Sequence, residues 1–349
     1  MNRMQRNLIL TDIMKTGDHL RLERFIALHS IPNQTFDTTS EFSLLQNYDL
    51  ESYDRKFAVI DFQNSNSSLQ DNQEFMNELD KRCKLLHSLG FIFIKANPWE
   101  SYANMLENRC YPEIDVRSIK WTGDVSWFWF YMYDKHMNNN FKFDHTNKKF
   151  DFLYLNKLPR PHRLSLYNKL KDKGVLEKSL YTFTMLDDPK RLPAEYELPG
   201  IRPEDYPRWG KDQDIYELPY NHTACSIVSE TNDNDHDVFM TEKIWKPIIA
   251  QHLFVVHGNY LYLQKLREMG FKTFSSHFDE SYDLERHKDR RQRKIVQTCL
   301  DITKKNWKDI YLQTQALRQH NYDTFFDKHK LSLQVNATLD LFLEFADRS

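Results

Sequence analysis

Short apolar runs alternate with segments of helical spacing along most of this chain. In the first half, the runs at 57–62 and 91–94 predict two buried strands, and apolar residues at helical spacing between them predict a helix over 75–89. This strand–helix–strand order is typical of a parallel sheet. A third run, the aromatic segment 127–133, is interpreted as a buried strand, with an acceptor-facing stacking surface as the alternative.

The second half repeats the same rhythm. Strands are predicted at 152–155, 179–183, 224–228, 253–256 and 271–274, with helices between them and a helical segment after 283 that packs back against the first domain. The polar, Asn- and Lys-rich segment 134–150 predicts an interdomain linker. We therefore predict an α/β protein of two Rossmann-like domains, residues 1–145 and 146–349, that face each other across a cleft.

Composition narrows the function classes. A chain of 349 residues with 40% hydrophobic content suits two folded domains, and its net charge of −2 gives no global signal for nucleic acid. The basic run 286–294 is either a solvated helix face or a contact for a polyanionic acceptor. The chain has only 8 glycines and no glycine-rich phosphate loop, which argues against a nicotinamide dehydrogenase or a P-loop enzyme. The absence of a signal-peptide pattern and of an apolar bilayer span predicts a cytoplasmic protein, in the host cytoplasm if the chain is viral.

A basic loop follows the predicted strand 152–155. It contains Asn156, Arg160, His162 and Arg163, and Pro161 suits the first turn of the helix that follows. Free N–H groups at a helix N-terminus hold phosphate well, and guanidinium groups add bidentate donors suited to a diphosphate.

Two glutamates mark the second candidate segment. Glu230 follows the predicted strand 224–228, at the edge where open α/β sheets bind ligands. Glu242 lies in the first turn of a helix that Thr241 caps, and Lys243 beside it can neutralise phosphate. Pro247 falls inside that helix and predicts that it is short or bent. A simple capping device and a solvated turn are the structural alternatives.

The pattern of Glu230, a short acidic gap, and then Thr241-Glu242-Lys243 opening a helix resembles the α-1,3-fucosyltransferase family over roughly the last half of the chain. The resemblance implies a two-Rossmann-domain (GT-B) glycosyltransferase with a UDP- or GDP-linked sugar as donor and no required cofactor. It implies diphosphate contacts from Arg160 and Arg163, with Lys243 joining them. Glu230 and Glu242 are then expected to contact ribose or donor sugar, and the acceptor is a glycan or a hydroxymethylated base of viral DNA.

A general base that deprotonates the acceptor hydroxyl is expected from the first domain. Asp61 and Glu100 follow predicted buried strands, and Asp124 is a third candidate. Two other functions stay open. Asp233, Asp235 and Asp237 satisfy the Asp-x-Asp pattern of metal-dependent glycosyltransferases, although a solvated loop explains them as well. A noncatalytic nucleotide- or carbohydrate-binding protein would keep the donor site without a base. The pattern does not indicate the oligomeric state.

Overall fold

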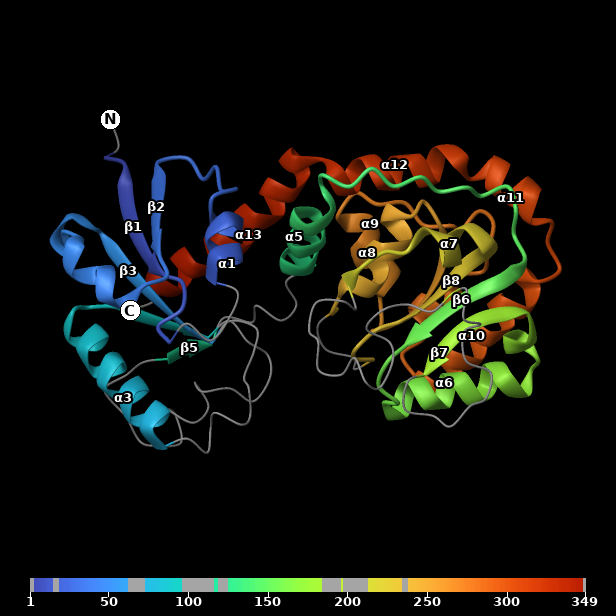
Figure 1. Ribbon diagram of the computed structural model, residues 1–349, viewed down its shortest axis with the longest axis horizontal. Helices are drawn as coiled ribbons and strands as arrows, with labels where there is room; N and C mark the ends of the chain where they lie inside the picture. Colours follow the sequence, from blue (N-terminus) through green and yellow to red (C-terminus); the bar gives the residue numbers. More distant parts are fainter. Residues whose placement is uncertain are drawn as a thin grey trace. The chain divides into compact units, whose positions relative to one another are not determined.

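The structure is a computed structural model that describes residues 3–14, 19–61, 73–95, 116–118, 125–183, 196, 213–233 and 238–347. The chain divides into two compact units (Figure 1). Unit 1 contains Met1–Phe130 and Lys328–Ser349, and unit 2 contains Tyr131–Asp327. The C-terminal helix thus belongs with unit 1, whereas the predicted second domain continues to residue 349. No helix among the described residues is long and apolar enough to cross a bilayer.

Unit 1 is built on a parallel sheet of five strands in the order β2-β1-β3-β4-β5. One face of α3 (Gln73–Ser88) buries Met76, Leu79, Cys83 and Leu86 at helical spacing against the side chains of β1, β3 and β4. The strands are β1 Gln5–Leu10, β2 Gln34–Thr39, β3 Arg55–Asp61, β4 Ile92–Lys95 and β5 Val116–Ser118, with α1 His19–Ile26 and the 3₁₀ turns η1 Phe42–Asn47 and η2 Leu50–Ser52 between them.

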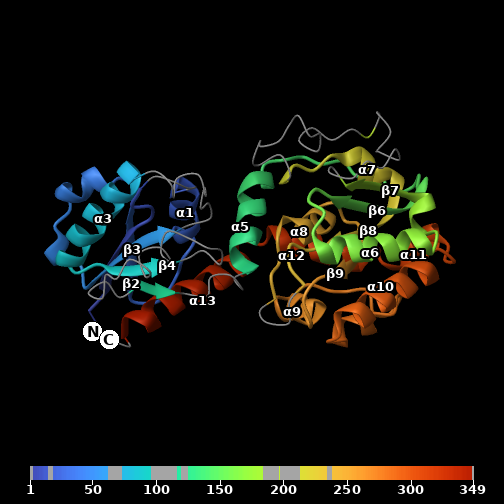
Figure 2. The ribbon, with the colours of Figure 1, turned by 90° about the horizontal axis from the view of Figure 1, so that it is seen from below.

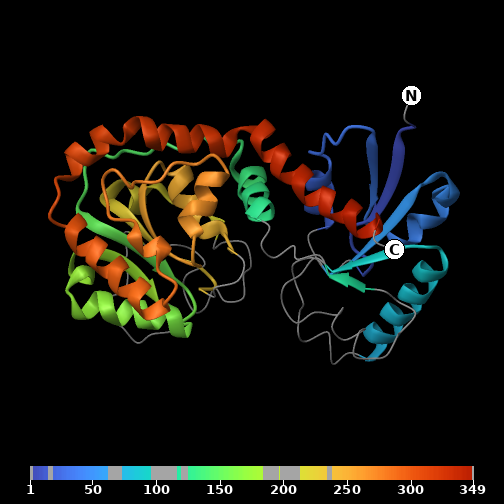
Figure 3. The same cartoon turned by 180° about the vertical axis from the view of Figure 1, so that it is seen from behind.

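The last helix, α13 (Lys328–Asp347), packs against unit 1 (Figure 3). Ser332 Oγ donates to the Leu28 carbonyl after α1 at 2.6 Å, and Phe342 meets Phe57 of β3 edge to face. Arg55 of β3 pairs with Asp347 at its end, 2.5 Å away. Of the helical segment after 283, which is predicted to pack against the first domain, only this last helix does so, because the residues up to Asp327 belong to unit 2.

Unit 2 carries a second parallel sheet, of four strands in the order β7-β6-β8-β9. Helix α6 packs beside α10, and α8 packs beside α12 (Figure 2). The prediction of two Rossmann-like α/β domains is therefore confirmed. The strands are β6 Phe150–Asn156, β7 Ser179–Phe183, β8 Thr223–Ser229 and β9 Leu253–His257. The helices are α6 Pro161–Asp172, η4 Val175–Lys178, α7 Glu217–His222, α8 Glu242–Ile249, α9 Tyr262–Glu268, η8 Ser281–Leu284, α10 Lys288–Ile302, α11 Trp307–Gln313 and α12 Gln315–Phe326.

Two strand predictions are wrong. Residues 127–133 belong to the helix α5 (Val125–His136), and 271–274 form no strand. Nearly all of 127–133 is buried, with Trp127 and Phe130 both against Phe25 of α1. A continuous apolar run has the same appearance in a buried strand and in a helix buried on all sides, so periodicity cannot separate them. The helix around Pro247 is short, as expected, and ends at Ile249.

Candidate functional site

The site is defined by the point where the strand order of unit 2 reverses. From β6 the chain moves to β7 on one side and then returns to β8 on the other side of β6. Open α/β sheets bind ligands at the carboxyl ends of the strands at such a switch point. Two segments about 70 residues apart in sequence meet there: the basic loop that leads into α6, and the loop from Glu230 to the start of α8.

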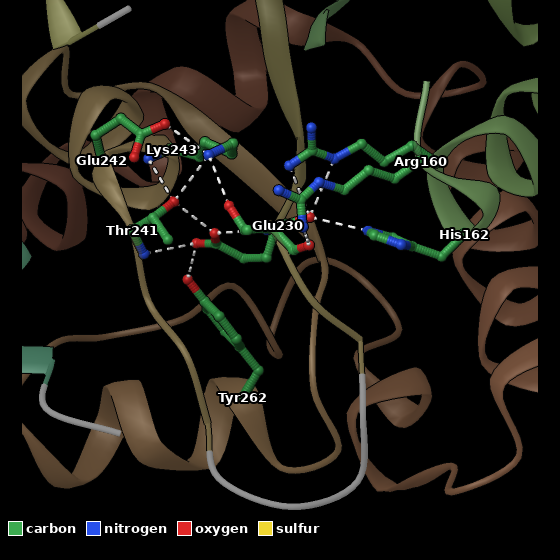
Figure 4. Close-up of polar contacts among 9 residues, drawn as sticks. Arg160, His162, Glu230, Thr241, Glu242, Lys243 and Tyr262 are labelled. Atoms are coloured by element: carbon green, nitrogen blue, oxygen red, sulfur yellow. Dashed lines mark hydrogen bonds and ion pairs between the residues drawn. The ribbon is translucent and has the colours of Figure 1, made fainter. Parts of the chain in front are cut away.

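Glu230 lies at the centre of this arrangement (Figure 4). Its side chain is completely buried, with 0% exposure, and its carboxylate accepts four hydrogen bonds. Oε1 accepts from the Thr241 amide at 3.1 Å and the Tyr262 hydroxyl at 2.7 Å. Oε2 accepts from the Thr241 hydroxyl at 2.6 Å and the Thr231 amide at 3.3 Å. Because four bonds fill the lone-pair positions of a carboxylate, Glu230 in this arrangement fixes the start of α8 to the end of β8.

Thr241, Glu242 and Lys243 lie together at the N-terminus of α8, as predicted. The Thr241 hydroxyl caps the helix by accepting from the Lys243 amide. The Lys243 ammonium donates to Glu242 Oε1 at 2.5 Å, Thr241 Oγ1 at 3.1 Å and Thr231 Oγ1 at 3.2 Å. Burial favours the neutral form of Glu242, but Lys243 and Lys246 outweigh it and lower the pKa of this carboxyl. Glu242 is thus held as a carboxylate, with its side chain 10% exposed.

Side chains of the basic loop bind the backbone carbonyls that follow β8. Arg163 Nε and Nη2 both donate to the Glu230 carbonyl, at 3.1 and 3.0 Å, and His162 Nε2 lies 3.0 Å from the same oxygen. Arg160 Nη1 donates to the next carbonyl along the chain, that of Thr231, at 2.8 Å. Arg163 is only 3% exposed, and burial lowers the pKa of its guanidinium. The structure therefore places these side chains at the switch point, while their contact with a diphosphate stays a prediction.

Asn156 ends β6 at the centre of this edge. Its side chain is 4% exposed, and neither its Oδ1 nor its Nδ2 has a hydrogen-bond partner among the described residues. A buried amide without a partner is costly, and such a group at a switch point is suited to meeting a ligand. Its predicted contact with the nucleotide-sugar also stays a prediction.

Sequence reasoning missed Tyr262 and Gly258. Tyr262 is buried in the first turn of α9, and its hydroxyl donates to Glu230, 32 positions earlier in the chain. A Cβ atom at Gly258 would lie 2.6 Å from Cδ2 of that ring, so only glycine fits there. The one signal in the sequence is Gly258 at the end of an apolar run, four positions before an aromatic residue, which is typical of close approach.

Of the three candidates for the general base, only the backbone of Asp61 lies within the described residues. Asp61 ends β3, where it pairs with Lys95 of β4 across a register irregularity, and its side chain lies outside the described residues. Glu100 and Asp124 also lie outside them. All three assignments stay predictions.

Of the three aspartates in the metal alternative, Asp235 and Asp237 lie outside the described residues. Asp233 forms an ion pair with Lys288 at 3.0 Å. Within the part of the chain that the structure describes, no group of three or more His, Cys, Asp or Glu side chains is placed to hold a metal ion.

Comparisons with known proteins give fold-level matches alone. Neither a protein-family model nor a curated protein sequence matches the chain. Two matching crystal structures are of α1,3-fucosyltransferase, the second with GDP-fucose. The first has 7% sequence identity and a TM-score of 0.39, and the match covers 93% of this chain and 92% of that chain. The second has 10% identity and a TM-score of 0.30, and covers 91% and 90%. The function of the site is therefore inferred from its own residues.

Proposed function

We propose that this protein is a glycosyltransferase that moves a sugar from a UDP- or GDP-linked donor to a hydroxyl group, without a metal ion. The observation that carries the proposal is the meeting of two helix N-termini, those of α6 and α8, at the switch point of unit 2. Both bring cations, Arg160 and Arg163 from one loop and Lys243 from the other. Helix N-termini and fixed cations together suit a diphosphate.

Breaking the bond between a sugar and a diphosphate places negative charge on the leaving oxygens, and cations fixed near them stabilise that charge. Glu242 is the carboxylate best suited to a ribose or sugar hydroxyl, since it has one ion pair and some exposure, whereas Glu230 is saturated by internal donors. We assign Glu230 a positioning role. The acceptor is a glycan or a hydroxymethylated base of viral DNA, deprotonated by Asp61, Glu100 or Asp124 of unit 1.

The ion pair between Asp233 and Lys288 favours the metal-free mechanism, because it neutralises one member of the Asp-x-Asp pattern. A noncatalytic binding protein would share the donor site. Only an enzyme would also hydrolyse the donor slowly in the absence of acceptor.

Thermal unfolding with UDP, GDP, ADP, CDP and dTDP, each with EDTA or with Mg²⁺, tests the donor site. A ligand at 100 times its dissociation constant stabilises the folded state by about 2.7 kcal/mol. We expect one nucleotide to stabilise the wild type and the exposed control E268Q, and E242Q to lose that response. Stabilisation that requires metal would favour the Asp-x-Asp alternative, and no response to any nucleotide would refute the donor site.

Chromatography of the matching nucleotide-sugar separates the enzyme from the binding protein. We expect slow release of nucleoside diphosphate by the wild type. One of D61N, E100Q and D124N should abolish it while keeping the thermal response to nucleotide. Binding without release in the wild type would favour the noncatalytic protein.

A further inference from the structure

Helix α10 begins with a group of exposed cations that the donor site does not use. Arg286, Arg290 and Arg293, here called the α10 cationic surface, are all exposed to solvent. Arg286 precedes the N-cap residue His287, and the other two lie on the first two turns. Positive charge just before a helix or in its first turn opposes the helix dipole, and this applies to Arg286 and Arg290. The sequence therefore places these cations where local stability disfavours them.

Acidic residues only partly neutralise this surface. The Arg286 guanidinium stacks over the Tyr260 ring at 4.6 Å, and Arg290 has no acidic partner among the described residues. Arg293 pairs with Asp289 at 2.7 Å, but Lys169 also contacts Asp289, at 3.2 Å. One carboxylate thus serves two cations, which leaves an excess of positive charge on the surface.

The inner side of the same helix fixes this surface to the edge that carries the donor site. Gln292 Nε2 donates to the His162 carbonyl at 3.0 Å, and Arg291 Nη1 donates to the Gly258 carbonyl at 2.7 Å. Lys288 reaches Asp233, three residues after Glu230. The start of α10 is therefore held against both loops that form the switch point.

We infer that the α10 cationic surface binds anionic groups, phosphate, sulfate or carboxylate, of a glycan acceptor. That this glycan is the acceptor of the transferred sugar rests on the proposed function. Guanidinium groups match these anions bidentately, and the half-buried Tyr260 ring with the exposed Arg286 over it offers a flat face beside them. Duplex DNA carries about one negative charge per 1.7 Å and favours a continuous cationic track. Here Glu285 and Asp289 interrupt the cations, which suits the wider spacing of charges on an anionic glycan.

The test is fluorescence anisotropy with three labelled probes: a heparin-derived hexasaccharide, neutral maltohexaose and a single-stranded dT12. The variant R286S/R290S/R293S is compared with K304S/K305S/K308S, which removes the same charge from exposed lysines at the opposite end of α10 and the start of α11. We expect the first variant to weaken hexasaccharide binding at least tenfold and to flatten its salt dependence, and the second to change it less than twofold.

Equal losses in both variants would overturn the inference, because they would show an effect of net charge alone. Equal binding of maltohexaose would overturn it as well, and tighter binding of dT12 would assign the surface to nucleic acid. Nucleotide-induced thermal stabilisation, measured on the same proteins, separates this inference from the proposed function. We expect R286S/R290S/R293S to keep that stabilisation. If no nucleotide stabilises the wild type, the proposed function fails, and the hexasaccharide comparison still decides whether the surface binds anionic glycans.

Discussion

Replacing Glu230 with alanine separates a residue that holds the site from one that binds the donor. The substitution removes the acceptor of four hydrogen bonds in a fully buried position. The hydroxyl groups of Thr241 and Tyr262 can turn toward other acceptors, but the amides of Thr231 and Thr241 cannot. A buried donor without a partner costs about 1–3 kcal/mol, so these two amides set an expected loss of roughly 2–6 kcal/mol.

Thermal unfolding of the protein without ligand measures this loss. For a unit of this size, 1 kcal/mol corresponds to about 2–4 °C in Tm, so we expect Glu230→Ala to lower Tm by roughly 4–24 °C. The matched control, Glu268→Ala, removes an exposed carboxylate from α9 and should stay within about 2 °C of the wild type. Glu242→Gln removes one ion pair and should lower Tm less than Glu230→Ala does, while it loses nucleotide binding.

The opposite pattern would refute the reasoning. If Glu230→Ala melts with the wild type and loses only its response to nucleotide, the four bonds contribute little to folding. Glu230 would then be a donor ligand, as the resemblance implies.

Three further predictions follow from buried groups. Gly258→Ala should destabilise unit 2 by about 1–3 kcal/mol in urea unfolding, because its Cβ would lie 2.6 Å from the Tyr262 ring. The same substitution in a Tyr262→Leu protein should cost much less, and equal costs in the wild type and in Tyr262→Leu would exclude the clash. Tyr262→Phe removes one of four donors to Glu230, and we expect a loss of about 1–2 kcal/mol with nucleotide affinity changed less than threefold; a larger loss of affinity in titration calorimetry would make Tyr262 a ligand. Burial lowers the pKa of Lys148 from 10.5 to about 7. Between these pH values the unfolded chain binds one more proton at Lys148 than the folded protein does. The free energy of unfolding therefore falls by about 1.4 kcal/mol per pH unit as the pH drops from 10.5 toward 7. Urea midpoints at pH 7.5 and 9.5 should show this slope in the wild type and not in Lys148→Met, and equal slopes in the two proteins would contradict it.

The two helix starts at the candidate site were predictable from local chemistry. Thr241 caps α8 because a hydroxyl before an apolar helical segment satisfies a free amide, and Pro161 begins α6 because it has no N–H to lose. These are interactions between near neighbours in the chain, so the sequence alone places both helix N-termini. Basic and acidic residues beside them then suggest phosphate chemistry before any contact is known.

What the tertiary structure decided is which segments meet. Strand order β7-β6-β8-β9 brings the basic loop onto the carbonyl of Glu230, a contact between residues 67 positions apart. Tyr262 reaches the same glutamate from α9, which no local pattern encodes. Helix α5 escaped prediction for the related reason that burial on all sides erases periodicity. The sequence by itself determined the strand-and-helix rhythm and the chemical groups at each helix start. Their meeting at one edge of the sheet, and the four hydrogen bonds that Glu230 accepts there, depend on contacts between distant segments.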